Sequence, residues 1–280
     1  NVLGYALTYP DALMQSASVL GIYALTIVAV VVFAGPWVLW HQAGGEERYW
    51  RFAAVGLALL PLALMTVWGA WRLAAFPIGI AGNGPMIRIV QPSVPQREKW
   101  RPENQRRIFD DHLVLSHTSA TGEPDLAAGI ALIVWPEAAM PFLPLDQPIA
   151  MTEIGRMLPP QTTLATGALR AEHPASGRRV FNSLLVFGSG EHARHLGSYD
   201  KTHLVPFGEY LPFQRWLEAV GLEQLSRLRG GFASGPEPRQ LLDIPRVGRL
   251  GPLICYEALF PGRVVQTAER PRALVNVTNE

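Results

Sequence analysis

Three short blocks of this chain carry side chains that could do chemistry, and each block follows or ends an apolar, strand-like run. They place Glu137, Lys201 and Cys255 along the chain in that order. A carboxylate, an ammonium and a thiol together supply a proton acceptor, an oxyanion stabiliser and a nucleophile. This is a complete set for acyl transfer. The blocks span residues 135–137, 199–210 and 253–257.

The thiol is the chain's single cysteine, so it cannot form an internal disulfide. Cysteine usage therefore does not indicate whether the protein is in an oxidising or a reducing compartment. A lone cysteine at the end of an apolar run is most often an inert core residue. Here Tyr256 and Glu257 follow Cys255, where a buried strand would favour apolar residues. A nucleophilic cysteine must ionise, which requires a nearby cation or base. His203 is one candidate, although no histidine has a sequence context typical of a papain-like pair.

Lys201 is the more plausible cation, because an ammonium near sulfur lowers the thiol pKa and can also stabilise an oxyanion. The alternative is a solvated surface lysine. Lys201 lies between Tyr199 and the mostly apolar residues 204–207, in a chain whose only other lysine is Lys99. Lysine, unlike arginine, can exchange a proton near neutrality when its surroundings lower its pKa.

Glu137 follows a proline at the end of a predicted strand, where the binding sites of open sheets collect. A carboxylate there can accept the thiol proton and later pass it to a leaving group. The alternative is a glutamate in the first turn of a helix, stabilised by the helix dipole.

The first 85 residues contain only six charged side chains, and this asymmetry divides the chain. Segments 18–40 and 52–71 are free of charge, and a membrane-spanning helix needs about 20 such residues. We therefore expect a membrane region, 1–84, with two transmembrane helices at about 18–40 and 52–74. A signal peptide is excluded by length and by the absence of a basic start. Buried helices of a soluble protein remain an alternative.

The orientation follows from the basic residues near the spans. Arg48 and Arg51 lie in or beside the connecting loop, whereas residues 1–17 have no lysine or arginine. The loop is then cytoplasmic and the C-terminal domain lies outside, on the periplasmic side of a bacterial cell. Arg72 counts against this orientation. The net charge of +1 does not indicate a surface that binds nucleic acid.

Residues 85–280 alternate short apolar runs with turns and polar helical stretches, which predicts an α/β or α+β sheet enzyme. A helix is expected at 97–117, kinked or started by Pro102. The strand at 132–135 should stop at Pro136, and 162–169 should form a hairpin with 180–187. The strand order is not predictable. The expected strands are 86–90, 132–135, 162–169, 180–187, 250–254 and 273–277.

The chain order of glutamate, lysine and cysteine resembles the carbon–nitrogen hydrolase (nitrilase) superfamily. The similarity is closer to the apolipoprotein N-acyltransferase family, bacterial inner-membrane enzymes that join several transmembrane helices to a nitrilase-like domain. The resemblance covers essentially the whole chain. It is carried by the two hydrophobic segments, the run from Gln91 to Trp100, Trp135-Pro136-Glu137, the block 200–212 and Ile254-Cys255-Tyr256-Glu257.

This resemblance implies an α-β-β-α sandwich preceded by transmembrane helices. By position it makes Glu137 the general base, Lys201 the stabiliser of the oxyanion and Cys255 the nucleophile. It also implies a set of supporting or substrate-binding residues, with the first as a candidate lid or substrate contact. These are Trp100, Glu209, Tyr256 and Glu257.

The implied reaction is ping-pong. Cys255 attacks an acyl ester of a membrane phospholipid, and the N-terminal amine of a diacylglyceryl-cysteine apolipoprotein then attacks the thioester. Both substrates lie in the bilayer, so membrane anchoring raises their effective concentration. No metal or organic cofactor is expected, and the sequence has no Cys/His zinc cluster. The implied location is the bacterial inner membrane, with a multi-pass anchor.

Two departures from this family lead us to expect a fragment lacking both ends. Family members continue beyond the Thr278-Asn279 pair with an aspartate, where Glu280 stands here, and they have more transmembrane helices. The nitrilase-like domain, 85–280, is then incomplete at its C-terminus. The alternatives are a membrane-tethered amidase acting on small amides, and a non-catalytic membrane protein with a degenerate domain.

Segment 211–229 has apolar residues at roughly helical spacing, with charged residues between them. This pattern predicts either an amphipathic arm on the membrane surface or a helix packed on its own domain. Glycines at 230, 231 and 235 after it would permit hinge motion.

Overall fold

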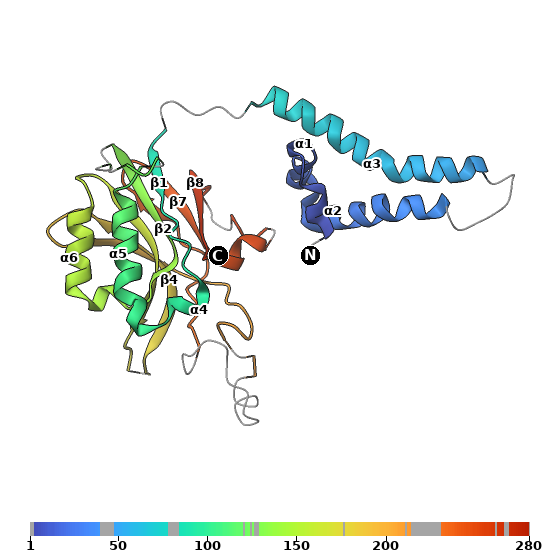
Figure 1. Ribbon diagram of the computed structural model, residues 1–280. Helices are drawn as coiled ribbons and strands as arrows, with labels where there is room; N and C mark the ends of the chain where they lie inside the picture. The colour runs from blue at the N-terminus through green and yellow to red at the C-terminus, as the bar shows by residue number, and fades with distance from the viewer. Residues whose placement is uncertain are drawn as a thin grey trace. The chain divides into compact units, whose positions relative to one another are not determined.

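The computed structural model forms two compact units, Asn1–Gly82 and Asn83–Glu280 (Figure 1). The predicted membrane-surface arm at 211–229 lies outside the described residues apart from Pro212 and Phe213, as does most of the loop that fixes the predicted orientation. The described residues are 3–39, 48–77, 84–119, 121–123, 125, 129–175, 177–210, 212–213, 231–260, 262–265 and 269–279.

The first unit contains two helices that are long and apolar enough to cross a membrane, over Ala17–Trp37 and Phe52–Ala75. Most of their large apolar side chains are exposed within the unit, including Ile27, Phe33 and Val67. Apolar faces turned outward suit a lipid environment better than water. The elements are η1 (Leu3–Leu7), α1 (Asp11–Met14), α2 (Ala17–Ala34), η2 (Gly35–Leu39) and α3 (Arg48–Ala75).

Small residues set the helix contacts of this unit. A Cβ added at Gly35 would lie 2.5 Å from the Cβ of Ala58, so the chain there packs closely on α3. Such close approach is typical of helices packed in membranes. Arg72, near the end of α3, donates hydrogen bonds to Gln15 Oε1 (2.8 Å) and Ser18 Oγ (3.1 Å).

The second unit is built on two sheets. The five-stranded sheet has the order β1-β2-β3-β4-β5, with β1, β2 and β3 parallel and β4 antiparallel to both its neighbours. In the three-stranded sheet β6 runs antiparallel and β8 parallel to the central β7. The strands are β1 (Met86–Ile89), β2 (Ile130–Met140), β3 (Thr163–Glu172), β4 (Arg179–Gly188), β5 (Arg194–Asp200), β6 (Leu242–Ile244), β7 (Gly248–Ile254) and β8 (Ala273–Val277).

The larger sheet is covered on both faces, by α5 (Gln105–Ser116) and α6 (Pro148–Met157) on one and by the smaller sheet on the other (Figure 1). Successive residues of a strand point to opposite faces. Accordingly Trp135 joins the core under the helices, and Val134 joins the core between the sheets. The α/β fold is confirmed, and the described residues form an α-β-β part of the expected sandwich.

Several predicted elements are confirmed and others are corrected. The strand at 86–90 and the hairpin of β3 with β4 are present. The helix expected at 97–117 is broken into α4 (Gln96–Lys99), η3 (Pro102–Asn104) and α5, with Pro102 at the break. The predicted strands at 250–254 and 273–277 correspond to β7 and β8, whereas β5, β6 and α6 were not predicted.

The expectation that Pro136 ends its strand is wrong, because β2 continues to Met140. Proline removes one N–H donor from a ladder without forcing the chain to turn. The pairing of β2 with β3 is instead interrupted between Trp135 and Met140. This irregular stretch of β2 contains Glu137.

Candidate active site

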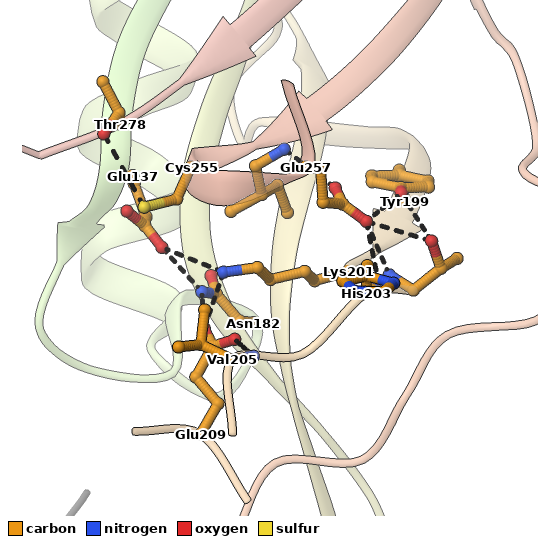
Figure 2. A network of polar contacts seen from close by, with 12 residues as sticks. Glu137, Asn182, Tyr199, Lys201, His203, Val205, Glu209, Cys255, Glu257 and Thr278 are labelled. Carbon is orange, nitrogen blue, oxygen red and sulfur yellow. Dashed lines mark hydrogen bonds and ion pairs between the residues drawn. The ribbon is translucent and has the colours of Figure 1, made fainter. Parts of the chain in front are cut away.

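Glu137, Lys201 and Cys255 meet at one place in the second unit (Figure 2). They come from three different strands: Glu137 from the irregular end of β2, Lys201 directly after β5 and Cys255 directly after β7. Lys201 Nζ lies 3.9 Å from Glu137 Oε1. Cys255 lies close enough to both for Glu137 to raise and Lys201 to lower the pKa of its thiol. The fold therefore brings together the three side chains that the sequence singles out.

The main chain around Glu137 has an unusual conformation. Ala138 adopts a φ of 44°, in the left-handed region that is sparsely populated by residues other than glycine. Gly167 of β3 allows the bulged chain to approach, since a Cβ there would lie 2.5 Å from Glu137 Cα. Lys99 Nζ donates a hydrogen bond of 2.6 Å to the Glu137 carbonyl oxygen. Local sterics and one ammonium thus fix where this carboxylate points.

Lys201 is not a solvated surface lysine, because its side chain is only 1% exposed. Its ammonium donates to Glu209 Oε1 at 2.8 Å. The other oxygen of Glu209, Oε2, accepts the Val205 N–H at 2.9 Å. Glu209 therefore neutralises the buried ammonium and holds the loop that follows it.

Asn182 of β4 joins the two carboxylates. Its Nδ2 donates to Glu137 Oε1 at 2.8 Å and to Glu209 Oε1 at 3.0 Å (Figure 2). Its Oδ1 is buried and has no hydrogen-bond partner among the residues that the structure describes. One amide therefore spaces and orients both acids beside Lys201.

Cys255 occupies a sharp turn, the first position of the short helix η5 (Cys255–Leu259), with a φ of 54°. Thr278 Oγ1 is its hydroxyl neighbour, with a contact of 3.8 Å to the sulfur. Burial, followed by the charge of Glu137, raises the pKa of the thiol, and the lowering effects of Lys201 and Thr278 are smaller. The expectation that a nearby cation keeps the sulfur ionised is therefore wrong for this state. Glu137 lies where it can accept the thiol proton.

Glu257 is fully buried and braces the site without lying next to the Lys201 ammonium. Its Oε2 accepts the Ile254 N–H at 2.9 Å, directly before Cys255. Its Oε1 accepts hydrogen bonds from the residues after Lys201 and also lies 3.5 Å from the Arg239 guanidinium. One carboxylate thus ties the nucleophile turn to the lysine loop. The donors to Oε1 are the Tyr199 hydroxyl, the Thr202 N–H and hydroxyl, and the His203 N–H (Figure 2).

The remaining predicted side chains lie toward solvent. Tyr256, next to Cys255, is 53% exposed, and Trp100, directly after α4, is 39% exposed. The His203 ring packs on Phe260, with ring centroids 3.9 Å apart. In the described part of the chain no three His, Cys, Asp or Glu side chains are grouped as metal ligands are.

Comparison with known proteins assigns the chain to a family. The family model described as carbon–nitrogen hydrolase matches residues 88–279, which include every residue of the site. The chain belongs to the carbon–nitrogen hydrolase family.

Its relatives include three proteins named apolipoprotein N-acyltransferase. Those of Rhodopseudomonas palustris, Bradyrhizobium diazoefficiens and Brucella suis are 40%, 38% and 39% identical to this chain over its whole length. The matched part is 52%, 52% and 51% of the relatives' own lengths. The chain thus spans about half the length of these curated relatives. A solved carbon–nitrogen hydrolase superfamily protein of Xanthomonas campestris is 21% identical over 69% of this chain and 64% of its own, with a TM-score of 0.42. That likeness is too low to add to the assignment.

Two residues of the candidate site, Asn182 and Lys99, were not predicted from the sequence. Asn182 is a polar residue inside the apolar run 180–187, and this contrast was the available signal. Lys99 was visible as one of only two lysines, both now found buried at the site. Nothing in the local sequence indicated which strands would bring them to Glu137.

Proposed function

We propose that this protein transfers an acyl chain from a membrane phospholipid to the N-terminal amine of a diacylglyceryl-cysteine apolipoprotein. The observation that carries the proposal is the meeting of Glu137, Lys201 and Cys255 at one site. The two apolar helices and the relatives named apolipoprotein N-acyltransferase support a lipid substrate. In this proposal the chain is anchored in the bacterial inner membrane, and the catalytic unit faces the periplasm.

In the first half-reaction the Cys255 sulfur attacks the ester carbonyl while Glu137 accepts the thiol proton. A thiol with a raised pKa suits this order, because the proton leaves as the sulfur–carbon bond forms. Lys201, paired with Glu209, stabilises the oxyanion. When the carbon–oxygen bond breaks, Glu137 returns the proton to the leaving oxygen. The products are a thioester and a lysophospholipid.

In the second half-reaction the neutral amine of the apolipoprotein attacks the thioester. Glu137 accepts a proton from the attacking nitrogen, and Lys201 again stabilises the oxyanion. The carbon–sulfur bond then breaks and the proton passes to the sulfur. The thiol is restored and an amide is formed, so protons and bonds balance over the cycle.

The other predicted residues take supporting roles in this scheme. Tyr256 and Trp100 are exposed beside the site and contact substrate, with Trp100 as a lid or contact aromatic. Glu209 neutralises Lys201, and Glu257 positions the two segments that carry Lys201 and Cys255. Both substrates lie in the bilayer, so an anchored enzyme meets them at a high effective concentration.

The second candidate is a membrane-tethered amidase that hydrolyses small amides. It uses the same thioester, and water replaces the amine as the second nucleophile. The half-exposed position of Cys255 favours this candidate, since water can reach the sulfur.

The two candidates are separated by offering both acceptors. Full-length protein in proteoliposomes is incubated with acyl-labelled phospholipid and a diacylglyceryl-cysteine peptide that has a free amine. We expect labelled N-acyl peptide and a labelled thioester on Cys255 that is absent in Cys255→Ser. Release of free acid without acylated peptide would sink the transferase proposal. Lys201→Arg should also lose activity, because the guanidinium is bulkier than the ammonium in this buried position.

A further inference from the structure

We propose that Lys99 is a second ammonium of this site, a positioning residue that holds the main chain of Glu137 and stabilises negative charge on the Cys255 sulfur. The inference deepens the proposed function and rests on its assignment of Glu137 as base and Cys255 as nucleophile. It adds a residue outside the trio to the groups that set the reactivity of the sulfur.

The contact of Lys99 with Glu137 is specific and buried. Lys99 ends the short helix α4, is 2% exposed, and its Nζ lies 2.6 Å from the Glu137 carbonyl oxygen. That carbonyl belongs to the stretch of β2 where pairing with β3 is interrupted. Hydrogen bonds from an ammonium are roughly twice as strong as neutral ones. Lys99 thus replaces a sheet partner and fixes the peptide that carries the proposed base.

The charges around Cys255 give Lys99 its second role. Glu137 and Glu209 are two carboxylates that share the single ammonium of Lys201. These three groups sum to one negative charge, which opposes a thiolate beside them. Lys99 brings the sum to zero. Its charge is attracted by both Glu137 and Cys255, so it acts at the sulfur as well as at the carbonyl.

The groups facing Lys99 leave it charged near neutrality. Burial lowers its pKa to about 8, and attraction to Glu137 on β2 and Cys255 on η5 opposes that fall. From α5 it faces His112, whose pKa is lowered to about 4 by burial and, to a smaller extent, by Lys99. The His112 Nδ1–H donates to Ile108 O at 2.7 Å, and the ring is neutral. Lys99 therefore meets one imidazole without charge, one carboxylate and the sulfur.

A cavity of about 260 Å³, lined by apolar and polar residues, lies beside Lys99 and His112. Lys99, His112 and Thr278 all line it, and the Thr278 hydroxyl contacts the Cys255 sulfur. His112 Nε2 is buried with no hydrogen-bond partner among the described residues. A cavity of this size can hold water beside the polar groups in its lining, and such water would solvate the remaining Lys99 donors. The lysine can stay protonated there without a side-chain carboxylate of its own.

The test measures thiol reactivity, which does not depend on which acyl acceptor is used. Full-length protein in detergent is alkylated with iodoacetamide across a pH series, and modification of Cys255 is quantified by peptide mass spectrometry. We expect Lys99→Met to raise the apparent thiol pKa by about one unit, which makes alkylation about tenfold slower near neutral pH. The difference should narrow above about pH 8, where Lys99 itself loses its proton.

Two further variants separate this role from a merely structural one. Arg97→Met removes the same charge from an exposed position on the same helix and should leave alkylation within about twofold of the wild type. Lys99→Arg keeps a charged donor and should recover part of the reactivity. In the acyl-transfer assay Lys99→Met should lower kcat about tenfold and leave KM unchanged.

The proposal is overturned if Lys99→Met shifts the alkylation profile no more than Arg97→Met does. It is also overturned if a Lys99→Met protein with unchanged thermal unfolding has normal kcat. Should Lys99→Met fail to fold, Lys99→Arg is the deciding variant. If Lys99→Arg is alkylated near neutral pH as slowly as is expected for a protein without the Lys99 charge, the role of that charge is contradicted. If acyl transfer is absent from the wild type while the alkylation shift is present, the proposed function fails and the role of Lys99 stands.

Discussion

The two sides of the candidate site differ in how firmly their side chains are held. On one side Glu137, Asn182, Lys201 and Glu209 are joined by hydrogen bonds of 2.8 to 3.0 Å. On the other side the half-exposed Cys255 has the looser Thr278 contact at 3.8 Å. The proposed base and cation are locked, and the proposed nucleophile is loosely held.

This difference follows from what each side does in the proposed reaction. Groups that stabilise developing charge act best when they are preorganised, because they then need no rearrangement in the transition state. The sulfur instead forms and breaks a bond with carbon in each cycle, so strong fixed partners would oppose its attack. If this comparison is right, changes on the locked side should cost far more activity than changes around the sulfur.

Glu257→Gln should have the largest effect, because this buried carboxylate holds both sides in place. An amide cannot accept hydrogen bonds with its nitrogen, and the substitution removes the negative charge that lies 3.5 Å from the Arg239 guanidinium. We expect a loss of about 3 kcal/mol in the free energy of unfolding. Activity should fall at least about 100-fold, measured as kcat for acyl transfer. Glu172→Gln, at an exposed ion pair with Arg170, is the control and should change neither quantity much. Wild-type kcat in Glu257→Gln would contradict the bracing role.

Gly167→Ala tests the locked side through its main chain. The added Cβ would lie 2.5 Å from Glu137 Cα and must push the carboxylate away from Lys201 and Cys255. A displacement of about 1 Å can cost about 100-fold in rate, so we expect kcat to fall by roughly that factor. Gly197→Ala in β5 is the matched control, since its Cβ would lie 3.5 Å from Leu242 Cδ2, an ordinary van der Waals contact. Equal kcat values for the two variants would show that the position of Glu137 is not critical.

Asn182→Ala removes the amide shared by the two carboxylates. Glu137 and Glu209 would lose their common donor, and their mutual repulsion would no longer be countered by that bridge. We expect kcat to fall about 10- to 100-fold, with the alkylation rate of Cys255 changed much less. Ser183→Ala is the control on the neighbouring residue, whose hydroxyl donates to Asp200 Oδ1 at 2.6 Å. That variant should lose about 1 kcal/mol of stability and keep its kcat.

How much the sequence predicts also differs between these two sides. Glu137, Lys201 and Cys255 could be predicted because each stands beside an apolar run, and their types form one chemical set. Asn182 could not, because its partners lie 45 and 27 residues away and meet it only through strand pairing. The edge strand β5 was missed because its first residues are exposed and show no apolar run. Local patterns thus predict strands and reactive residues better than the contacts between them.

The direction of the pKa shift of the Cys255 thiol also could not be predicted from the sequence. Sequence reasoning placed a cation near Cys255 and inferred an ionised sulfur. Lys201 does lower the pKa, but burial and Glu137 raise it by more. The sign of the net shift depends on depth in the fold and on the distances to two opposite charges. Neither quantity can be derived from the spacing of residues along the chain.

Thr278→Val should have the smallest effect, because it changes the loosely held side. Thr278 lowers the pKa of the Cys255 thiol through its hydroxyl contact at 3.8 Å. Valine has nearly the same shape and no donor, so the thiol pKa should rise and alkylation near neutral pH should slow by about twofold. Because a higher pKa means less thiolate at a given pH, the rising limb of the rate–pH profile should move toward alkaline pH. Thr118→Val, whose hydroxyl donates to Val114 O in the same helical turn, is the control. A tenfold loss in Thr278→Val would mean that the sulfur is as firmly held as the base, and the contrast between the two sides would fail.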